Sequence, residues 1–173
     1  MINKPNIKFI EDGHVYLAMK DGREIQLTSS TTFLKRFEKP FPRDFIAPKS
    51  AAKRLREGKT KGVTAEEVVD MWSMKGDMAR LFGNAVHKAV ECWIKYEELP
   101  KNDYLIKAVE SFKKLKIGPC AAEYVMGSID LELGGMADII QPIPGKPYCV
   151  NLLDIKTNAD LYEVRGKLLP PFA

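Results

Sequence analysis

The sequence predicts an α+β fold, and the grouping of its patterns supports this class. A β meander opens the chain, helical patterns fill its middle, and a three-stranded β unit precedes a short tail. Strands that are grouped apart from helices are typical of α+β proteins. The 173 residues, 45% of them apolar, are enough to bury one core, so we expect a single globular domain over residues 1–173.

The opening segment alternates polar and apolar side chains and is interrupted by Asp-Gly pairs at 12–13 and 21–22. Such pairs are typical of tight hairpin turns. Hydroxyl residues that follow offer N-caps for a helix beginning near Thr32. We therefore expect a helix there, preceded by three antiparallel strands at 6–11, 14–19 and 24–28.

Prolines delimit the next expected helix. Pro40, Pro42 and Pro48 interrupt the chain and confine this helix to residues 49–57. Gly58 provides its stop, because glycine readily adopts the left-handed conformation that ends many helices.

The clearest helical pattern covers residues 77–97, after a short separate helix begun by the capping-box pair Thr64 and Glu67. The pattern predicts a broad buried stripe made of Met78, Leu81, Phe82, Ala85, Val86, Ala89, Val90, Trp93 and Ile94. His87 lies far from the centre of this stripe. It shares a polar flank, either solvated surface or the wall of a cleft, with Arg80, Gly83, Asn84 and Glu91.

The last third of the chain predicts one more helix and three strands. The helix covers residues 102–116 and ends before Gly118-Pro119. The strand patterns cover residues 121–126, 133–141 and 148–156.

Positive charge is concentrated in one segment. From Lys35 to Lys61 there are ten basic and three acidic residues, about +7 in a chain of formal net charge +4. A phosphate backbone would favour such a segment because binding releases counterions, and a solvated surface is the plain alternative. Phe37, Phe41 and Phe45 stand in this segment. One interpretation is that they are core or hinge residues. The other is that their rings stack on the bases of single-stranded nucleic acid.

Cysteine usage and hydropathy exclude several classes. The three cysteines are widely spaced and form no C-x-x-C pair, so the sequence predicts neither a disulfide framework nor a zinc site. An iron–sulfur cluster needs four thiolates, and the chain has three cysteines, so we expect no such cluster. No apolar run has membrane-spanning length and no signal peptide opens the chain. We expect a cytoplasmic protein, in a bacterium or a phage-infected host cell, with no membrane partner.

Two aspartates and a lysine near the end of the chain suggest phosphodiester chemistry. Asp138 and Asp154 fall on expected neighbouring strands, and Lys156 shares a strand face with Asp154. Apolar flanks predict burial of both carboxylates, which is costly unless something binds them. Magnesium prefers such oxygen ligands, the Ile155 carbonyl could complete its shell, and an ammonium can offset charge on phosphate. Alone, D-x-K is a weak signal, since such pairs are often surface ion pairs.

Four segments in order resemble the PD-(D/E)xK nuclease superfamily: Gly83-Asn84-Ala85-Val86-His87, Glu123-Tyr124, Gly135-Met136-Ala137-Asp138 and Asp154-Ile155-Lys156-Thr157. The histidine-bearing helix and the D-x-K-T strand are similar to its RecB-type branch. That branch includes phage and prophage recombination exonucleases and mitochondrial genome maintenance exonucleases. The resemblance spans about residues 28–157 and implies a restriction-endonuclease-like core, in which helices flank a mixed central sheet.

The resemblance implies a set of site residues. His87, Asp138 and Asp154, with the Ile155 carbonyl, would bind Mg²⁺, for which Mn²⁺ can substitute. Lys156 would be the catalytic lysine. Glu123 would support a second metal or position the site, and the plain alternative is a strand carboxylate paired with a lysine. The expected DNA contacts are Lys35, Arg36, Lys53, Arg54, Arg56 and Arg80.

The implied function is a magnesium-dependent deoxyribonuclease, an exonuclease acting in recombination or repair on single-stranded DNA or duplex ends, with a recombination or replication protein as a further partner. Members of the branch usually continue into a helix with a glutamine and a tyrosine, which is missing here. By this resemblance we expect a shortened protein, a natural fragment or a degenerate member of the branch. A nuclease-fold module that binds nucleic acid or a partner without turnover stays the alternative.

The expected parts of the chain are a meander at 1–30, a basic helical segment at 31–75, a nuclease core at 76–157 and a tail at 158–173.

Overall fold

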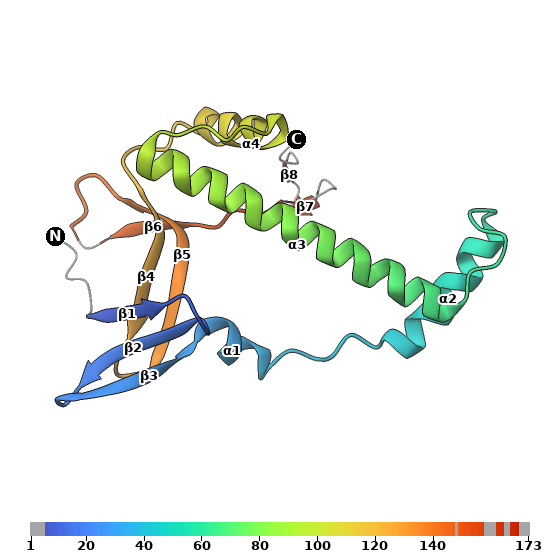
Figure 1. Cartoon of the computed structure of the whole chain (residues 1–173), viewed down its shortest axis with the longest axis horizontal. Helices are drawn as coiled ribbons and strands as arrows, with labels where there is room; N and C mark the ends of the chain where they lie inside the picture. The colour runs from blue at the N-terminus through green and yellow to red at the C-terminus, as the bar shows by residue number, and fades with distance from the viewer. Residues whose placement is uncertain (1–5, 148, 158–161, 165–166, 170–173) are drawn as a thin grey trace. The chain divides into compact units, whose positions relative to one another are not determined.

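The computed structural model describes residues 6–147, 149–157, 162–164 and 167–169 (Figure 1). The chain divides into two compact units. Unit 1 comprises Met1–Glu38 and Ala85–Ala173, and unit 2 comprises Lys39–Asn84. One long helix contributes residues to both units. Whether they fold together as the expected single domain stays a prediction.

The opening of unit 1 is an antiparallel meander, as the Asp-Gly pairs predicted. Asp21 and both turn glycines, Gly13 and Gly22, have positive φ angles, the conformation that tight hairpins require. The strands are β1 (Ile7–Ile10), β2 (Val15–Lys20) and β3 (Arg23–Ser29). They pair in chain order.

The meander continues into a mixed open sheet through β3. The remaining strands are β4 (Ala121–Ser128), β5 (Leu133–Pro142) and β6 (Val150–Leu153). Their order is β1-β2-β3-β5-β4, with β6 also paired to β5. The β3–β5 pair is parallel and the other pairs are antiparallel. This confirms the α+β class with a mixed sheet flanked by helices.

The junction of β3 and β5 depends on a glycine. A Cβ at Gly134 would lie 2.7 Å from the Cβ of Tyr16 and 3.3 Å from that of Leu27. Tyr16 and Leu27 are almost fully buried, together with Ala18, in one core cluster of the sheet. Gly134 therefore allows β5 to approach the meander closely enough to extend its sheet.

Side chains cap the starts of two helices of unit 1, and the first of these caps is one of the expected hydroxyls. The Ser29 hydroxyl accepts the Thr32 amide at the start of α1 (Ser30–Lys35). Asn102 caps α4 (Asp103–Lys114), which packs with the C-terminal part of α3 (Ala65–Tyr96) against β5. Figure 1 shows α4 beside that end of α3. Their shared core contains Ala89, Val90, Val109, Phe112 and Ile139.

In unit 2 the helix α2 (Arg43–Arg56) is longer than expected, and the expected confinement by proline is wrong. Pro48 lies inside α2, where it removes one backbone hydrogen bond. Ala47 and Ala51 compensate by packing against Val68, and all three are buried. Gly58 has φ +65 just after the helix, so its expected role as a stop is confirmed.

The helix α3 is continuous through Gly76, so the expected break between two helices is wrong. Its start is as expected: the Thr64 amide donates to Glu67 Oε2 at 2.8 Å, and the Glu67 amide donates to Thr64 Oγ1 at 3.1 Å. The expected burial of the whole apolar stripe is also wrong. Val86, Ala89 and Val90 are buried, whereas Met78, Leu81 and Phe82 are exposed.

The expected tail contains two short strands, β7 (Tyr162–Val164) and β8 (Lys167–Leu169), which pair antiparallel. Residues 158–161, 165–166 and 170–173 of the tail lie outside the described residues. Among the helices that the structure describes, none combines the length and the apolarity needed to cross a bilayer.

Candidate metal centre

Three elements of unit 1 bring together an imidazole and two carboxylates. His87 lies on α3, Glu123 on β4 and Asp138 on β5. One ligand atom from each residue lies within 4.8 Å of the others. All three residues are half-buried, so the cluster is partly shielded from water. Of the three side chains expected at one metal ion, His87 and Asp138 lie together in this group, and Asp154 does not belong to it.

The strand register accounts for the two carboxylates. Ala122 pairs with Ile139 and Tyr124 pairs with Ala137, so Glu123 and Asp138 occupy the intervening opposed positions. Side chains opposed across antiparallel strands project from the same face. Glu123 has φ +50, a left-handed conformation that is uncommon for a residue with a side chain and that stores backbone strain. Such strain is often found at functional sites.

The imidazole is oriented by the main chain of Ile155. His87 Nε2 lies 2.7 Å from the Ile155 carbonyl oxygen, which can only accept, so Nε2 is the donor. In the neutral ring this leaves the lone pair on Nδ1, which lies 3.5 Å from Asp138 Oδ1. Metal-binding histidines usually have this arrangement, with the second ring nitrogen hydrogen-bonded to a carbonyl or carboxylate.

The same residue also fixes a carboxylate. The Ile155 amide donates to Asp138 Oδ2 at 2.7 Å, so one residue positions both His87 and Asp138 through its backbone. Ile155 was expected at the site as a carbonyl ligand, and its clamp-like role was missed. Backbone groups carry no sequence signal, because every non-proline residue has the same amide and carbonyl.

Negative charge accumulates at the cluster. Burial raises the pKa of Glu123, and the carboxylates of Glu91 and Asp138 raise it further, while His87 and Lys95 act in the opposite direction. A cation bound between these carboxylates would relieve both effects.

The donor set fits a divalent metal ion. Two carboxylates suit Mg²⁺ or Mn²⁺, which prefer oxygen ligands, and an imidazole nitrogen is also a common ligand of first-row transition metals. The Ile155 carbonyl accepts its hydrogen bond from His87 Nε2, on the opposite side of the ring from Nδ1, so the expected role of this carbonyl as a ligand does not fit an ion bound at Nδ1. Zinc is an alternative occupant by ligand type, although a structural zinc site would have four protein ligands.

The expected burial of Asp154 is wrong. Strand β6 ends at Leu153, and the side chains of Asp154 and Lys156 are 62% and 70% exposed. Lys156 Nζ lies 3.0 Å from each Asp154 carboxylate oxygen. Leu152 is itself 59% exposed, so the apolar sequence around the motif does not reflect a buried strand.

Asp154 is still in register with the cluster. The pair Ile139–Leu153 comes last in the β5–β6 ladder, and one more pair would place Asp154 opposite Asp138. In the described residues, however, the group of potential metal ligands contains Glu123 and not Asp154. Of the two interpretations of Glu123, its geometry favours a role at the site over a strand carboxylate paired with lysine.

The polar flank of α3 divides into two parts. The Glu91 side chain is 14% exposed and is contacted by Lys88 at 2.8 Å and Lys95 at 2.6 Å, so it belongs to a partly buried charged group near the centre. Arg80, an expected DNA contact, is 71% exposed and lies 3.0 Å from Asp77 in unit 2.

The other expected DNA contacts are located on helices of both units. Lys35 and Arg36 close α1 in unit 1, and both are exposed. Three more lie in the last turn of α2 in unit 2: Lys53, Arg54 and Arg56. Among these, Arg54 is half-buried and its guanidinium lies 3.9 Å from the sulfur of Met71, and Lys53 is 3.8 Å from Glu57.

Comparisons with protein-family models, with curated proteins and with solved structures find no match to this chain. The geometry of its residues therefore carries the functional interpretation.

Proposed function

We propose that this protein is a metal-dependent DNA nuclease, an exonuclease that hydrolyses phosphodiester bonds in recombination or repair. The single observation that carries the proposal is the oriented cluster of His87, Glu123 and Asp138. Its imidazole presents Nδ1 toward a carboxylate because Nε2 is hydrogen-bonded to Ile155. The expected restriction-endonuclease-like core belongs to the same proposal.

In this proposal His87, Glu123 and Asp138 hold Mg²⁺, or Mn²⁺ in its place. A divalent cation there supplies Lewis acidity and offsets negative charge at a phosphate. The protein contributes preorganisation: Ile155 holds one imidazole nitrogen and one carboxylate oxygen in place through two hydrogen bonds of 2.7 Å. Fixed donors need little reorganisation when the ligand arrives.

Lys156 is proposed as the catalytic lysine, with Asp154 as an additional ligand. The Lys156 ammonium is exposed, and Asp154 follows directly the strand that pairs with β5. Extension of that pairing by one residue brings Asp154 opposite Asp138. An ammonium beside a scissile phosphate orients water and offsets charge that develops in the transition state.

One observation favours the second function, a nucleic-acid-binding module without turnover. Asp154 and Lys156 pair with each other at 3.0 Å, and Asp154 lies outside the group of three potential ligands. A chain that kept the cluster but not the productive position of this pair would bind metal and nucleic acid without cutting.

A cleavage assay on end-labelled single- and double-stranded DNA separates the two functions. We expect cleavage with Mg²⁺ or Mn²⁺ and none with chelator. Calorimetric titration with Mn²⁺ then measures metal binding independently of turnover. Metal binding without cleavage would support the second function, and absence of both would overturn the metal centre.

Substitution of Asp154 tests whether the exposed pair belongs to the centre. Asp154→Ala should abolish cleavage while folding and DNA binding persist, because the side chain is 62% exposed and contributes little to packing. Asp130→Ala, an exposed carboxylate between β4 and β5, is the matched control and should leave the rate unchanged. Full activity of Asp154→Ala would remove Asp154 from the mechanism.

A further inference from the structure

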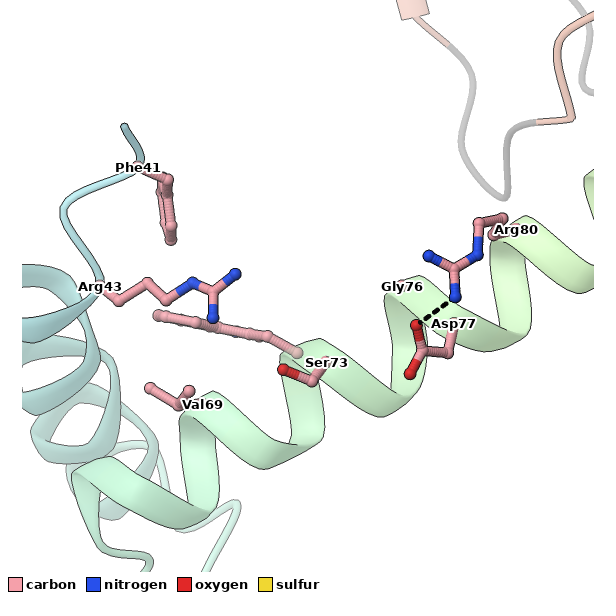
Figure 2. A pocket seen from close by; sticks show the side chains of 8 residues that line it. Phe41, Arg43, Val69, Ser73, Gly76, Asp77 and Arg80 are labelled. Carbon is pink, nitrogen blue, oxygen red and sulfur yellow. Dashed lines mark hydrogen bonds and ion pairs between the residues drawn. The ribbon is translucent and has the colours of Figure 1, made fainter. Parts of the chain in front are cut away.

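Unit 2 contains a pocket that the proposed chemistry does not use. Its volume is about 640 Å³, within the range of ligand sites in proteins. It lies between the start of α2 and the first half of α3 (Figure 2). The lining residues are Phe41, Arg43, Val69, Trp72, Ser73, Gly76, Asp77 and Arg80.

Two aromatic rings form the apolar part of the pocket. The rings of Phe41 and Trp72 have centroids 5.7 Å apart and an interplanar angle of 70°. Phe41 is 57% exposed, so its ring is available to a planar ligand. Trp72 packs against the buried core of unit 2, which holds its ring in place. Aromatic platforms of this kind stack on nucleobases, largely without regard to sequence.

Two guanidinium groups give the pocket a positive charge. Figure 2 shows Arg43 close to Phe41 and shows Arg80 further along α3, joined to Asp77. Asp77 neutralises one of the two arginines, and among the described residues no ion pair involves Arg43. Arginine binds phosphate through a planar, multiply donating group. Ser73 adds a hydroxyl at the wall of the pocket.

A second pocket of unit 2 has the opposite character. It measures about 420 Å³ and is lined by three carboxylates, Asp44, Glu66 and Asp70, without a basic residue. A phosphate would be repelled there. Of these two pockets, only the Phe41–Trp72 pocket combines exposed aromatic surface with positive charge.

We propose that the Phe41–Trp72 pocket binds one unstacked base of single-stranded nucleic acid, with the base against Phe41 and Trp72 and a flanking phosphate at Arg43. This inference rests on the proposed function insofar as the substrate is nucleic acid, and it adds a base-binding site distinct from the metal centre. Contacts to a stacked base and a phosphate make binding depend on bases as well as on charge.

The direct test measures Trp72 fluorescence in the presence of chelator, so that neither metal nor cleavage is needed. The chain has two tryptophans, Trp72 and Trp93, and the substitution Trp93→Phe leaves Trp72 as the reporter. Oligothymidylate should quench its emission, whereas an abasic strand of equal length should not. Binding seen by anisotropy without any quenching would overturn the proposal.

Affinities measured on the otherwise unchanged chain provide a second test that does not depend on the folding of Trp93→Phe. Oligothymidylate should bind roughly tenfold more tightly than the abasic strand, as expected for stacking of one base. Phe41→Ala should remove this difference. Phe45→Ala is the matched control, because Phe45 is 64% exposed but lies outside the pocket, beside Lys49. Arg43→Gln should lower the affinity for oligothymidylate and for the abasic strand about equally.

The outcomes separate this proposal from the nuclease proposal. Metal-dependent cleavage with equal affinity for intact and abasic strands would overturn the pocket alone. Base-dependent binding that Phe41→Ala abolishes would support the pocket, even in a chain that does not cleave. A loss of base dependence in Phe45→Ala equal to that in Phe41→Ala would also overturn it, because the effect would then belong to exposed phenylalanines in general.

Discussion

The two candidate sites differ in charge, in burial and in how their side chains are held. The cluster of His87, Glu123 and Asp138 in unit 1 is acidic and half-buried, and backbone hydrogen bonds from Ile155 fix two of its members. The Phe41–Trp72 pocket in unit 2 is aromatic and carries positive charge, and Phe41 is largely exposed. Fixed ligand atoms suit a small cation, whereas exposed aromatic surfaces suit a flexible single strand of nucleic acid. Mutations should therefore be able to abolish cleavage without weakening the binding of nucleic acid, and the reverse.

The same contrast occurs along α3. Near His87 the helix buries Val86, Ala89 and Val90, but in unit 2 it exposes Met74, Met78 and Leu81. A single apolar stripe thus supports a packed core in one unit and stays accessible in the other. Residues that hold a site rigidly are found where the helix is covered by sheet and by α4.

The largest expected effect is that of Asp138→Asn. We expect cleavage to fall at least about 100-fold and Mn²⁺ affinity to fall with it, since loss of even an outer partner of a metal ligand costs about 10- to 100-fold. Asparagine retains an oxygen that can accept the Ile155 amide, so the fold should persist by circular dichroism. Cleavage rates and calorimetry measure the effect, and quenching of Trp72 by oligothymidylate should be unchanged. Unaltered metal affinity would contradict the assignment.

A smaller effect is expected from neutralising the end of α2. The triple variant Lys53→Gln, Arg54→Gln, Arg56→Gln should weaken strand binding and flatten its salt dependence by about 0.7 for each phosphate that the variant no longer neutralises. Anisotropy at several salt concentrations measures the slope. A variant with the same reduction of charge on or beside α4, Lys101→Gln, Lys107→Gln, Lys114→Gln, is the control. Equal slopes for the two variants would assign the α2 charges to plain solvated surface.

The smallest effect concerns Glu91 and its pH dependence. Burial by itself would raise the pKa of Glu91, but Lys88 and Lys95 hold it below its ordinary value of 4.5. Because the folded pKa is lowered, the stabilisation is present above pH 4.5 and is lost as the pH falls through the folded value. Glu91→Gln should cost about 0.5 kcal/mol in the free energy of unfolding at pH 7, given that the lysines are solvated.

Urea unfolding at pH 7 and at pH 3 measures this difference, which should shrink at the lower pH because the unfolded carboxyl is then protonated. A difference between the Glu91→Gln variant and the parent chain that is undiminished at pH 3 would attribute the effect to packing rather than to charge.

Features set by neighbours in sequence were predicted well. The Asp-Gly turns, a hydroxyl cap at the start of α1 and the reciprocal pair Thr64 and Glu67 depend on residues within a few positions of one another. Tertiary packing overrode two local rules. Pro48 was accommodated within α2 because the neighbouring alanines pack against Val68, and Gly76 did not interrupt α3.

The candidate site was predicted in part. The resemblance to a nuclease superfamily, together with the position of His87 off the apolar stripe, led to the grouping of His87 with Asp138, and these two side chains do lie together. The burial of Asp154 was inferred from apolar neighbours, but it depends on whether another element covers β6, and Leu152 there is exposed. The pocket at Phe41 and Trp72 unites residues that are remote in sequence: Phe41 was one of three candidate base platforms, but no local pattern indicated Trp72 as its neighbour.

By itself, the sequence determined the class of the fold, the turns and caps, and the identity of the acidic and imidazole groups available for chemistry, because these depend on side-chain type and on short-range backbone geometry. Only the tertiary structure decided that Glu123 opposes Asp138, that the Ile155 backbone orients His87 and Asp138, and that Asp154 lies outside the cluster. The physical reason is that strand register and helix packing bring together groups remote in sequence, and a hydrogen bond depends on their final separation.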